Sequence, residues 1–356
     1  MATATRTTIE QLEVSTREIP TDAHESDGTL EWDSTTIVIV EAHAGGAAGI
    51  GYTYTDAAAA KLIEGKLQDA VKGADAMEVR SAWQAMSRAI RNVGRPGLGF
   101  MALSAVDLAL WDLKARLLER PLVEVLDAAH DAVPVYGSGG FCSYSDEQLA
   151  DQLRGWAEAG IPRVKMKVGR EPGRDRERVA VAREAIGDDT DLYVDANGAL
   201  SRQDALAWSR AYAEDFGVKW FEEPVSSDDL EGLAFLRDNS PPGIEIAAGE
   251  YGDILPYFER MAPVVDCLQA DVTRCGGITG LLEVAAVAHA HEVDVSAHCA
   301  PAISAHAFCA VERLRHLEYF HDHVRVEHDL FDGVLEPDDG ALRPDRTRPG
   351  NGLSLK

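Results

Sequence analysis

The sequence is short of positive charge. Its 356 residues include 34 lysines and arginines against 60 aspartates and glutamates, which gives a formal net charge of −26. Affinity for nucleic acids and for anionic membrane surfaces comes mainly from basic residues. Neither is therefore an expected partner. The 46% of hydrophobic residues can supply one large core and a smaller one, and the composition has no bias typical of disorder.

Three other features are absent from the sequence. The cysteines form no C-x-x-C pair, which is typical of a reduced intracellular protein without a thiolate zinc site. They are Cys142, Cys267, Cys275, Cys299 and Cys309. The start of the chain, MATATRTTIEQLEVSTREIP, has no basic region before an apolar core, so no signal peptide is predicted and a cytoplasmic location is expected. No apolar run approaches the roughly 20 residues that span a bilayer, which predicts a soluble protein.

The chain divides into three regions by pattern. Residues 1–130 begin with strand-like segments at 9–14 and 35–42, followed by apolar residues at helical spacing, and predict a small α+β domain. From 131 to 324, short apolar runs rich in β-branched residues alternate with amphipathic helices, which predicts a parallel sheet. Residues 325–356 lose this alternation and are expected to pack back on the first domain.

The number of strand candidates decides between two parallel architectures. Eight runs in roughly 200 residues favour a closed α/β barrel over a doubly wound sheet, which would fit a shorter series. The runs are VPVYGS, PRVKMKV, DLYVDAN, VKWFEEP, IEIAAGE, VVDCLQAD, EVDVSAH and HLEYF. No glycine-rich phosphate motif follows any of them, and the run GGAAGIG lies in the first region, so a nucleotide site is not favoured.

Most of these runs carry an ionisable residue near their C-terminal end, where barrel enzymes keep their active sites. The series is Lys165 and Lys167, Asp195, Glu222, Glu250, Asp271, His298 and Glu318. From Lys167 onward the steps are 28, 27, 28, 21, 27 and 20 residues, close to one βα unit each. One acid alone at a strand end is more often a cap or a solvated residue. A series of ionisable residues in register is not explained by caps or solvated residues, because buried charges are costly unless they are paired or bound to metal.

Three carboxylates of the series fall on consecutive strands. Asp195, Glu222 and Glu250 offer only oxygen ligands, which favours Mg²⁺. A cluster of acids that share a proton is the alternative. Glu223 is left out of the metal set, because strand alternation directs it away from Glu222.

The remaining members suggest acid and base catalysis. Lys165 and Lys167 are two residues apart and so share one face of a strand, where joint burial is expected to lower their pKa values and to make a usable base. Asp271 and His298 end neighbouring strands, and a carboxylate beside an imidazole fixes its tautomer. For the lysine pair taken alone, the alternative is a solvated strand edge with a K-x-K pattern. For Asp271 and His298 taken alone, the alternative is a structural histidine.

The motifs that carry these residues are VKMKVG, VDANGAL, FEEPV, AAGE, QADVTRCGGITG, SAHCAP and HLEYF. In order and spacing this set resembles the enolase superfamily, and within it the mandelate racemase subgroup. The resemblance implies an N-terminal α+β capping domain, a modified (β/α)₇β TIM-type barrel, a C-terminal segment that completes the cap, and Mg²⁺ at the three carboxylates. Muconate cycloisomerase and dipeptide epimerase relatives have a lysine on the sixth strand. Here that strand ends at Asp271, so a cycloisomerase is disfavoured, as is enolase proper.

The resemblance also implies a reaction, in which the α-proton of a carboxylate substrate is removed and an enediolate forms. Lys165 adds positive charge, Lys167 and His298 exchange protons on opposite faces, and Glu318 bonds a carboxylate oxygen. If the second group protonates a β-hydroxyl, an aldonate or aldarate is dehydrated to a 2-keto-3-deoxy acid. If it protonates carbon, the result is racemisation or epimerisation.

We favour dehydration, because most members of the subgroup handle polyhydroxy acids. A barrel that binds a metal or ligand without catalysis is a third possibility, against which the intact Lys167 and His298 argue.

In this subgroup the cap supplies specificity. It is expected to do so here through a loop at about 19–32 and another near 51–55. His24, Glu25, Trp32 and the Asn197 of VDANG are the candidates for contact with a hydroxylated substrate. A small-molecule carboxylate is the expected ligand, and a homo-oligomer, either a dimer or an octamer, is the expected assembly.

Overall fold

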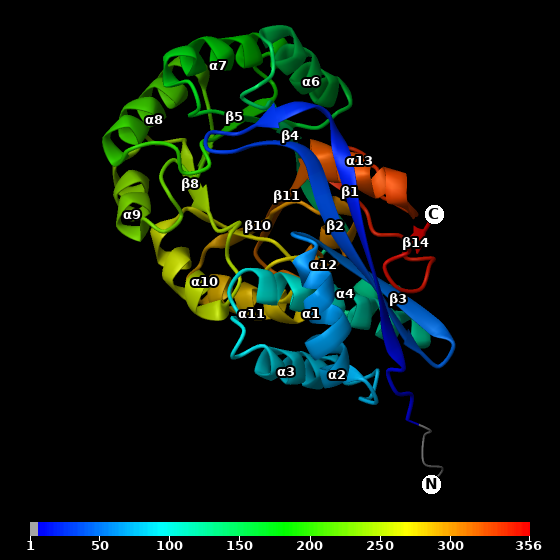
Figure 1. Cartoon of the computed structure of the whole chain (residues 1–356). Helices are drawn as coiled ribbons and strands as arrows, with labels where there is room; N and C mark the ends of the chain where they lie inside the picture. Colours follow the sequence, from blue (N-terminus) through cyan, green and yellow to red (C-terminus); the bar gives the residue numbers. More distant parts are fainter. Residues whose placement is uncertain (1–5) are drawn as a thin grey trace.

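A parallel barrel stands at the centre of the molecule, which we describe from a computed structural model of residues 6–356 (Figure 1). Each strand pairs in parallel with the next, and β11 pairs with β4 to close the ring. The strands are β4 (Val133–Gly139), β5 (Arg163–Lys167), β6 (Asp191–Asp195), β7 (Trp220–Glu222), β8 (Glu245–Ala248), β9 (Cys267–Ala270), β10 (Asp294–Ala297) and β11 (Leu314–Phe320). All eight predicted strands are confirmed.

Seven helical connections join these eight strands, as the (β/α)₇β architecture requires. They are α6 (Asp146–Glu158), α7 (Pro172–Ile186), α8 (Arg202–Phe216), α9 (Leu230–Asn239), α10 (Leu255–Met261) with a 3₁₀ turn (Ala262–Val264), α11 (Gly277–Ala290) and α12 (Pro301–Phe308). Side-chain caps start three of them, since Ser145 caps α6 together with Gln148, Ser201 caps α8 and Asp229 caps α9. Within β5, Val164 and Met166 alternate with the two lysines, so the apolar residues face the surrounding helices.

The cap is an antiparallel sheet with helices on one side. Its sheet has the order β1 (Gln11–Ser26), β2 (Glu31–Ala44) and β3 (Ala47–Tyr54). Its helices are α1 (Ala58–Leu62), a π-helical turn (Ile63–Leu67), α2 (Gln68–Val71), α3 (Val79–Ala89), α4 (Leu98–Leu117) and α5 (Leu122–Val125). Helix α4 contacts both β3 and the barrel helix α11, and it joins the two cores.

The glycine-rich run that ends in β3 has a packing role. A Cβ atom at Gly49 would lie 2.2 Å from the backbone nitrogen of Leu113, and one at Gly51 would lie 2.3 Å from the carbonyl oxygen of Ala105. These two glycines are two residues apart and so face α4 together. Only glycine permits the sheet to approach this helix so closely.

Most of both segments of the cap predicted as loops is strand, which corrects the sequence interpretation; residues 27–30 and Thr55 lie outside the strands. Residues 19–26 continue β1, residues 31–32 begin β2, and residues 51–54 belong to β3. The first two form the end of a long hairpin, because β1 and β2 stay paired with a register shift between Pro20 and Glu25. This stretch shows no strong alternation of apolar and polar residues, because both faces of the paired strands carry polar residues.

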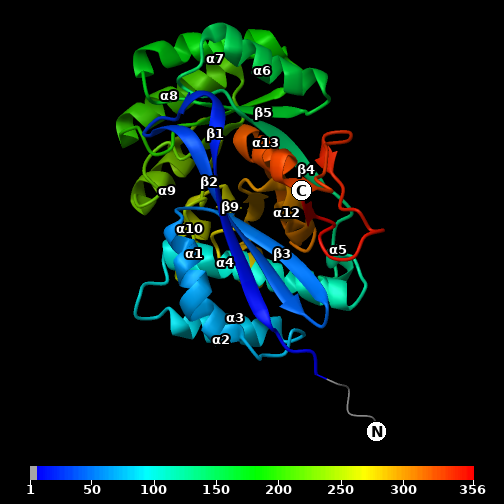
Figure 2. The same cartoon turned by 45° about the vertical axis from the view of Figure 1, so that its right-hand side comes forward.

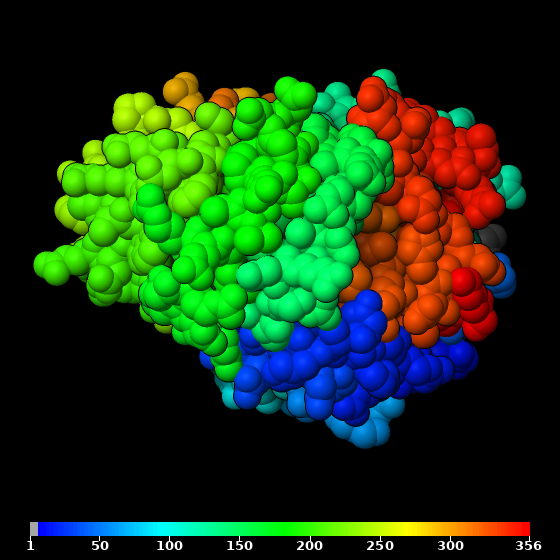
Figure 3. Space-filling model, turned by 90° about the horizontal axis from the view of Figure 1, so that it is seen from above, coloured from blue at the N-terminus to red at the C-terminus, as the bar shows by residue number. Residues whose placement is uncertain are grey.

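The end of that hairpin lies on the barrel. A Cβ atom at Gly28 would be 2.4 Å from the carbonyl oxygen of Ala196 and 2.8 Å from that of Val168. The amide of Cys142, after β4, donates to the carbonyl of Ser26 at 2.7 Å. Figures 2 and 3 show the blue hairpin against the green first units of the barrel. The cap therefore covers the C-terminal ends of β4, β5 and β6.

The C-terminal segment contacts both the cap and the barrel. It consists of α13 (His321–Leu330), β12 (Phe331–Asp332), β13 (Ala341–Leu342) and β14 (Ser354–Leu355). The Arg116 guanidinium of α4 donates to the carbonyl of Leu353 at 2.6 Å, while β13 pairs antiparallel with the barrel strand β4. Within residues 6–356, no helix combines the length and the apolar character needed to cross a membrane.

Candidate active site

Neighbouring barrel strands bring the predicted charged residues to one level. In the parallel register, Lys167 at the end of β5 is opposite Asp195, and Asp195 at the end of β6 is opposite Glu222. Glu250 follows the next strand, β8, after one glycine. The barrel closure thus places these side chains together at its C-terminal end, as their spacing predicts.

The three predicted metal ligands form a compact group. Asp195, Glu222 and Glu250 each offer an oxygen within 4.8 Å of the others, and all three are buried. Oε2 of Glu250 has no hydrogen-bond partner. Burial and the Asp195 and Glu318 carboxylates, against the opposing charge of Lys165, raise the pKa of Glu222 to about 8. The all-oxygen donor set of the three carboxylates fits Mg²⁺.

The lysines are ion-paired, which corrects the expectation of lowered pKa values. Lys167 Nζ lies 2.5 Å from Asp195 Oδ2. Lys165 Nζ bonds Glu222 and lies 2.8 Å from Glu318 Oε1. Burial lowers the pKa of each lysine, but the neighbouring carboxylates outweigh it and raise both above the ordinary value. For Lys167 the attraction of Asp195 exceeds the repulsion by Lys165.

His298 and Asp271 form the predicted dyad. Nδ1 of His298 lies 2.8 Å from Asp271 Oδ2, and the amide and hydroxyl of Thr273 both donate to Asp271 Oδ1 at 2.7 Å. The carboxylate is thereby fixed on both oxygens and directs Nε2 of His298 away from itself. Burial lowers the pKa of His298, but the carboxylates of Glu250 and Glu318 and the bond to Asp271 raise it above the ordinary value.

Glu318 links the lysine side of the site to the histidine side. Its Oε1 accepts from Ser138 Oγ at 2.6 Å and lies 2.8 Å from Lys165 Nζ. Its Oε2 lies 3.5 Å from Nε2 of His298. Burial raises the pKa of Glu318, but Lys165 and the other cations lower it well below the ordinary value. Glu318 is therefore a fixed anion between the two candidate acid/base groups.

The candidate substrate contacts are placed differently from one another. Asn197 is buried after β6, its amide donates to Asp195 Oδ1 at 2.8 Å, and its side-chain oxygen has no partner. Trp32 donates to Glu25 at 2.9 Å and lines an open cleft of about 410 Å³ where the cap meets the end of β11. His24 is exposed, with Nε2 3.7 Å from Glu31. Contact of these residues with a substrate stays a prediction.

Two families of known domains match this chain. Residues 9–127 match the mandelate racemase/muconate lactonizing enzyme N-terminal domain, and residues 148–356 match the enolase C-terminal domain-like family. The chain belongs to the mandelate racemase group of the enolase superfamily. The resemblance drawn from the motifs is thus confirmed, as are the barrel and the cap that it implied.

Named relatives within this superfamily include enzymes of more than one kind. The 3,6-anhydro-alpha-L-galactonate cycloisomerase of Streptomyces coelicolor is 33% identical over 98% of this chain and 97% of its own length. The L-talarate/galactarate dehydratase of Salmonella typhimurium is 32% identical over 83% of this chain and 74% of its own length. A cycloisomerase therefore stands among the named relatives, although the sixth strand of this chain ends at Asp271.

Solved structures agree with the fold over nearly all of the chain. A mandelate racemase/muconate lactonizing enzyme-like protein from Rubrobacter xylanophilus is 60% identical, with a TM-score of 0.97 over 98% of this chain and 97% of that one. A racemase from Streptomyces coelicolor A3(2) with bound magnesium is 32% identical, with a TM-score of 0.91 over 98% of this chain and 97% of that one. The protein is an enzyme of this superfamily.

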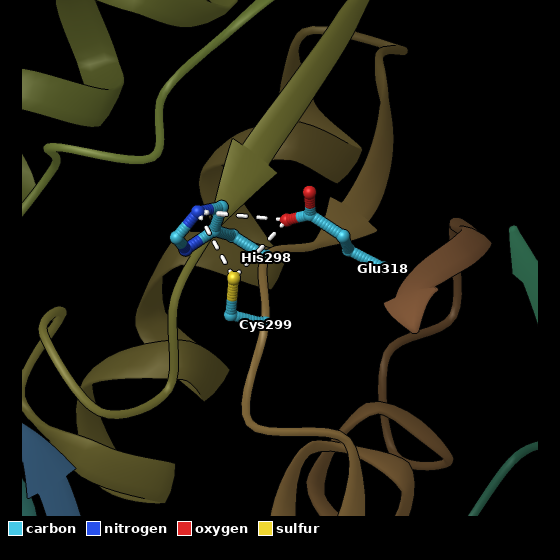
Figure 4. Close-up of side chains that lie close together, drawn as sticks. All are labelled: His298, Cys299 and Glu318. Atoms are coloured by element: carbon cyan, nitrogen blue, oxygen red, sulfur yellow. Dashed lines mark hydrogen bonds and ion pairs between the residues drawn. The ribbon is translucent and has the colours of Figure 1, made fainter. Parts of the chain in front are cut away.

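Cys299 is part of the site, although the motif analysis did not single it out. Its Sγ lies 3.3 Å from Nε2 of His298 and 3.2 Å from Oε2 of Glu318 (Figure 4). Cys299 and Ala300 adopt φ angles of +51° and +47°, each of which costs a non-glycine residue of order 1–2 kcal/mol. Strand β10 ends at Ala297, so alternation does not hold for Cys299, and the backbone turn brings its thiol beside His298.

Glu223, which the sequence analysis left out of the metal set, stands where strand alternation no longer applies. It follows the end of β7 with φ +38°, so its side chain does not simply point away from Glu222. It is buried, and Oε1 has no hydrogen-bond partner. Burial and the Glu250 carboxylate raise its pKa well above the ordinary value. It lies near the acidic group but outside the set of three carboxylates that can share a cation.

Proposed function

We propose that the protein is a Mg²⁺-dependent hydro-lyase that converts an aldonate or aldarate to a 2-keto-3-deoxy acid. The observation that carries the proposal is the placement of Lys167 and of the His298–Asp271 dyad at the same barrel end as three convergent carboxylates. Strand β10 is separated from β5 by β11 and β4, so the two groups approach a substrate from different sides. The named dehydratase among the relatives supports the substrate class.

Asp195, Glu222 and Glu250 are the residues that hold Mg²⁺ in this proposal. They fit it because all donors are carboxylate oxygens and one of them, Oε2 of Glu250, has no hydrogen-bond partner. When bound, the cation supplies positive charge that favours the enediolate form of the substrate. The magnesium in the related racemase structure supports the same choice of metal.

Lys167 takes the α-proton in this mechanism. Its ammonium is held by Asp195, which is also a proposed metal ligand. If Asp195 held the cation, its charge would be shared with the metal, the effect that raises the pKa of Lys167 would be weaker, and the neutral amine that accepts a proton would be favoured. Lys165 keeps its pairing with Glu318 and contributes fixed positive charge next to the developing enediolate.

His298 donates a proton to the departing β-hydroxyl. The carboxylates of Glu250 and Glu318 raise its pKa and so favour the protonated imidazole, and the bond from Nδ1 to Asp271 directs Nε2 toward the site. Glu318 donates a hydrogen bond to a carboxylate oxygen of the substrate only in its protonated form, so we propose that it takes up a proton when the substrate binds, while Ser138 holds its other oxygen. In this scheme water leaves from the β-carbon, and the resulting enol becomes the ketone.

Two other outcomes use the same first step. Return of the proton to carbon by His298 gives a racemase or epimerase, and one related structure is named a racemase. Attack within the substrate gives a cycloisomerase, and one relative bears that name. Both lack the net loss of water, so product analysis separates them from dehydration.

The test is a screen of aldonic and aldaric acids with Mg²⁺ in D₂O, followed by semicarbazide. We expect one substrate class to exchange its α-proton and to give a semicarbazone, with no product in excess chelator or with Lys167→Ala. A substrate that changes optical rotation without forming a carbonyl would replace dehydration by racemisation. A cyclic product of unchanged mass would replace it by cycloisomerisation.

A further inference from the structure

Three chemically different donor atoms meet at one point of the barrel mouth. Nε2 of His298, Sγ of Cys299 and Oε2 of Glu318 are separated by 3.3, 3.2 and 3.5 Å, and all three residues are buried (Figure 4). Each atom points toward the other two, and each residue offers a metal ligand. The proposed Mg²⁺ ligands include none of these three residues.

We propose that His298, Cys299 and Glu318 form a second cation site, which takes a thiophilic divalent ion such as Zn²⁺ and whose occupation stops catalysis. Zinc binds sulfur, nitrogen and oxygen at about 2.3, 2.0 and 2.0 Å, and tetrahedral angles then separate the donor atoms by about 3.3–3.6 Å. The three measured separations agree with these edges to within a few tenths of an ångström. A cation therefore fits the triangle without a large movement of the backbone.

Ligand chemistry separates this site from the three carboxylates. Mg²⁺ prefers oxygen alone, whereas a thiolate and an imidazole favour Zn²⁺. The site needs no C-x-x-C pair, because Cys299 and His298 are adjacent in sequence and Glu318 comes from the neighbouring strand β11. The absence of such pairs excluded only the commoner thiolate arrangement.

The surrounding residues orient two of the three ligands. Asp271 bonds Nδ1 of His298 at 2.8 Å and so leaves Nε2 free to face the triangle. Ser138 and Lys165 bond Oε1 of Glu318 at 2.6 and 2.8 Å and leave Oε2 facing the same point. Outer partners of this kind fix ligand direction in zinc sites, with a carboxylate behind the histidine as a frequent form.

An independent observation points to a fourth ligand. Oε2 of Glu250 is buried, has no hydrogen-bond partner, and lies 3.4 Å from Nε2 of His298. Glu250 is also a proposed ligand of Mg²⁺, so the same carboxylate belongs to both sites. A zinc ion in the triangle would then compete for Glu250.

Binding changes the protonation of the ligands. The S–H bond of Cys299 breaks, a bond from sulfur to the cation forms, and the proton passes to the buffer. Nε2 of His298 releases any proton it holds. Inhibition follows from the proposed function, because His298 and Glu318 are the groups that this function assigns to proton donation and substrate binding; binding of the cation itself does not depend on that function.

Cobalt(II) provides a test that does not require a substrate. Co²⁺ replaces Zn²⁺ in tetrahedral sites, and its bond to a thiolate gives an intense near-ultraviolet charge-transfer band that carboxylate ligation does not. We expect the full-length protein, saturated with Mg²⁺, to develop this band with one equivalent of Co²⁺ and to lose it on addition of Zn²⁺. Cys299→Ser should abolish the band, because a hydroxyl of similar size cannot supply it.

Two variants serve as controls. Cys142→Ser removes the one cysteine that is not fully buried, and Glu222→Gln disrupts the proposed Mg²⁺ set; both should retain the band. With an active substrate, Zn²⁺ should inhibit the Mg²⁺-loaded enzyme, and Cys299→Ser should weaken this inhibition at least about tenfold. No band, or a band that survives in Cys299→Ser, would overturn the second site. A Cys299-dependent band without inhibition would retain the site and contradict the proposed roles of His298 and Glu318.

Discussion

Lys165 shows how a few side chains set the charge of the whole site. Its fully buried ammonium contacts Glu222 and Glu318 and lies 3.5 Å from Asp195 Oδ2. Trp220 Nε1 satisfies the other oxygen of Glu222 at 2.9 Å. The acidic residues thus have defined partners on the lysine side, while Glu250 has no such partner for its Oε2. A cation is most needed on the Glu250 side.

Glu222→Gln tests the metal at the level of one residue. The amide keeps the size and the bond to Lys165 but removes a negative charge. We expect Mg²⁺ at 100 times its Kd to stabilise the wild type by about 2.7 kcal/mol and the variant not at all. Thermal unfolding with and without Mg²⁺ measures this, with the exposed Glu231→Gln as the control. Full turnover of the wild type in excess chelator would contradict a metal role.

His298→Asn separates the two proton transfers. Lys167 remains, so the α-proton of the substrate should still exchange with D₂O. Formation of the keto product should fall by about 10²–10⁴, the usual contribution of a positioned general acid. Lys167→Ala should stop both. Proton NMR and a carbonyl assay on the same samples report the two steps, and unchanged product formation in His298→Asn would remove the histidine from the mechanism.

Among the elements, the β1–β2 hairpin connects the cap to the chemistry. Trp32 near its end stacks edge to face on Phe141, which follows β4, with ring centroids 5.5 Å apart. Its indole also faces Asp322 of α13 at 3.3 Å. The same element therefore touches barrel segments that lie far apart in sequence, and a shift of the hairpin would move the wall of the cleft.

Gly28→Ala tests this connection. The added methyl group would meet two backbone carbonyl oxygens that cannot move aside, so the hairpin end must lift from the barrel. We expect kcat/KM to fall by about 10- to 100-fold, as small displacements of positioning groups do, with little change in Tm. Gly155→Ala in α6, where a Cβ meets nothing within 4 Å, is the matched control and should leave kinetics unchanged. Equal kinetics in the two variants would show that the hairpin end does not position the site.

For the whole molecule, buried histidines make stability depend on pH. His306 in α12 is 1% exposed, and burial lowers its pKa from 6.5 to about 4 against the weaker pull of Asp345. Below pH 6.5 the unfolded chain takes up a proton at this residue while the folded chain does not. The stability present above pH 6.5 is therefore lost as the pH falls toward 4.

The expected loss at His306 is about 3 kcal/mol between pH 6.5 and pH 4. Urea unfolding of the wild type and of His306→Leu across this range measures it. The unfolding free energy of the variant should depend less on pH, and its slope should correspond to up to one fewer proton taken up on unfolding. The reason is that leucine fills the site without titrating. Parallel pH profiles would mean that the imidazole is protonated in the folded state.

The assembly of the molecule stays a prediction. A dimer or octamer should give a mass in light scattering that is a multiple of the 38.5 kDa chain. Exposed apolar side chains, Val93 and Leu98, stand in the segment that borders a cavity of about 460 Å³ between the cap and helices α10 and α11. A mass of one chain at micromolar concentration would contradict the prediction.

The barrel and the place of its charged residues follow from sequence alone, because both rest on local periodicity. An apolar run that ends in a polar residue specifies a strand and a position at its end, and repeated spacing carries Lys167, Asp195 and Glu222 to one level. The same reasoning fails where a strand stops. Alternation gives no direction to Glu223 or Cys299, since the backbone turns to positive φ just after β7 and β10.

Other features depend on distances between strands that the sequence does not contain. The raised pKa values of the lysines result from carboxylates that approach within bonding distance, which spacing along the chain cannot reveal. The hairpin at 19–32 looks like a loop because its stability comes from pairing across the sheet and from contact with the barrel, and its residues show little alternation. The sequence determined which residues reach the barrel mouth. The tertiary structure decided which of them touch, because their contacts are set by the curvature and closure of the sheet.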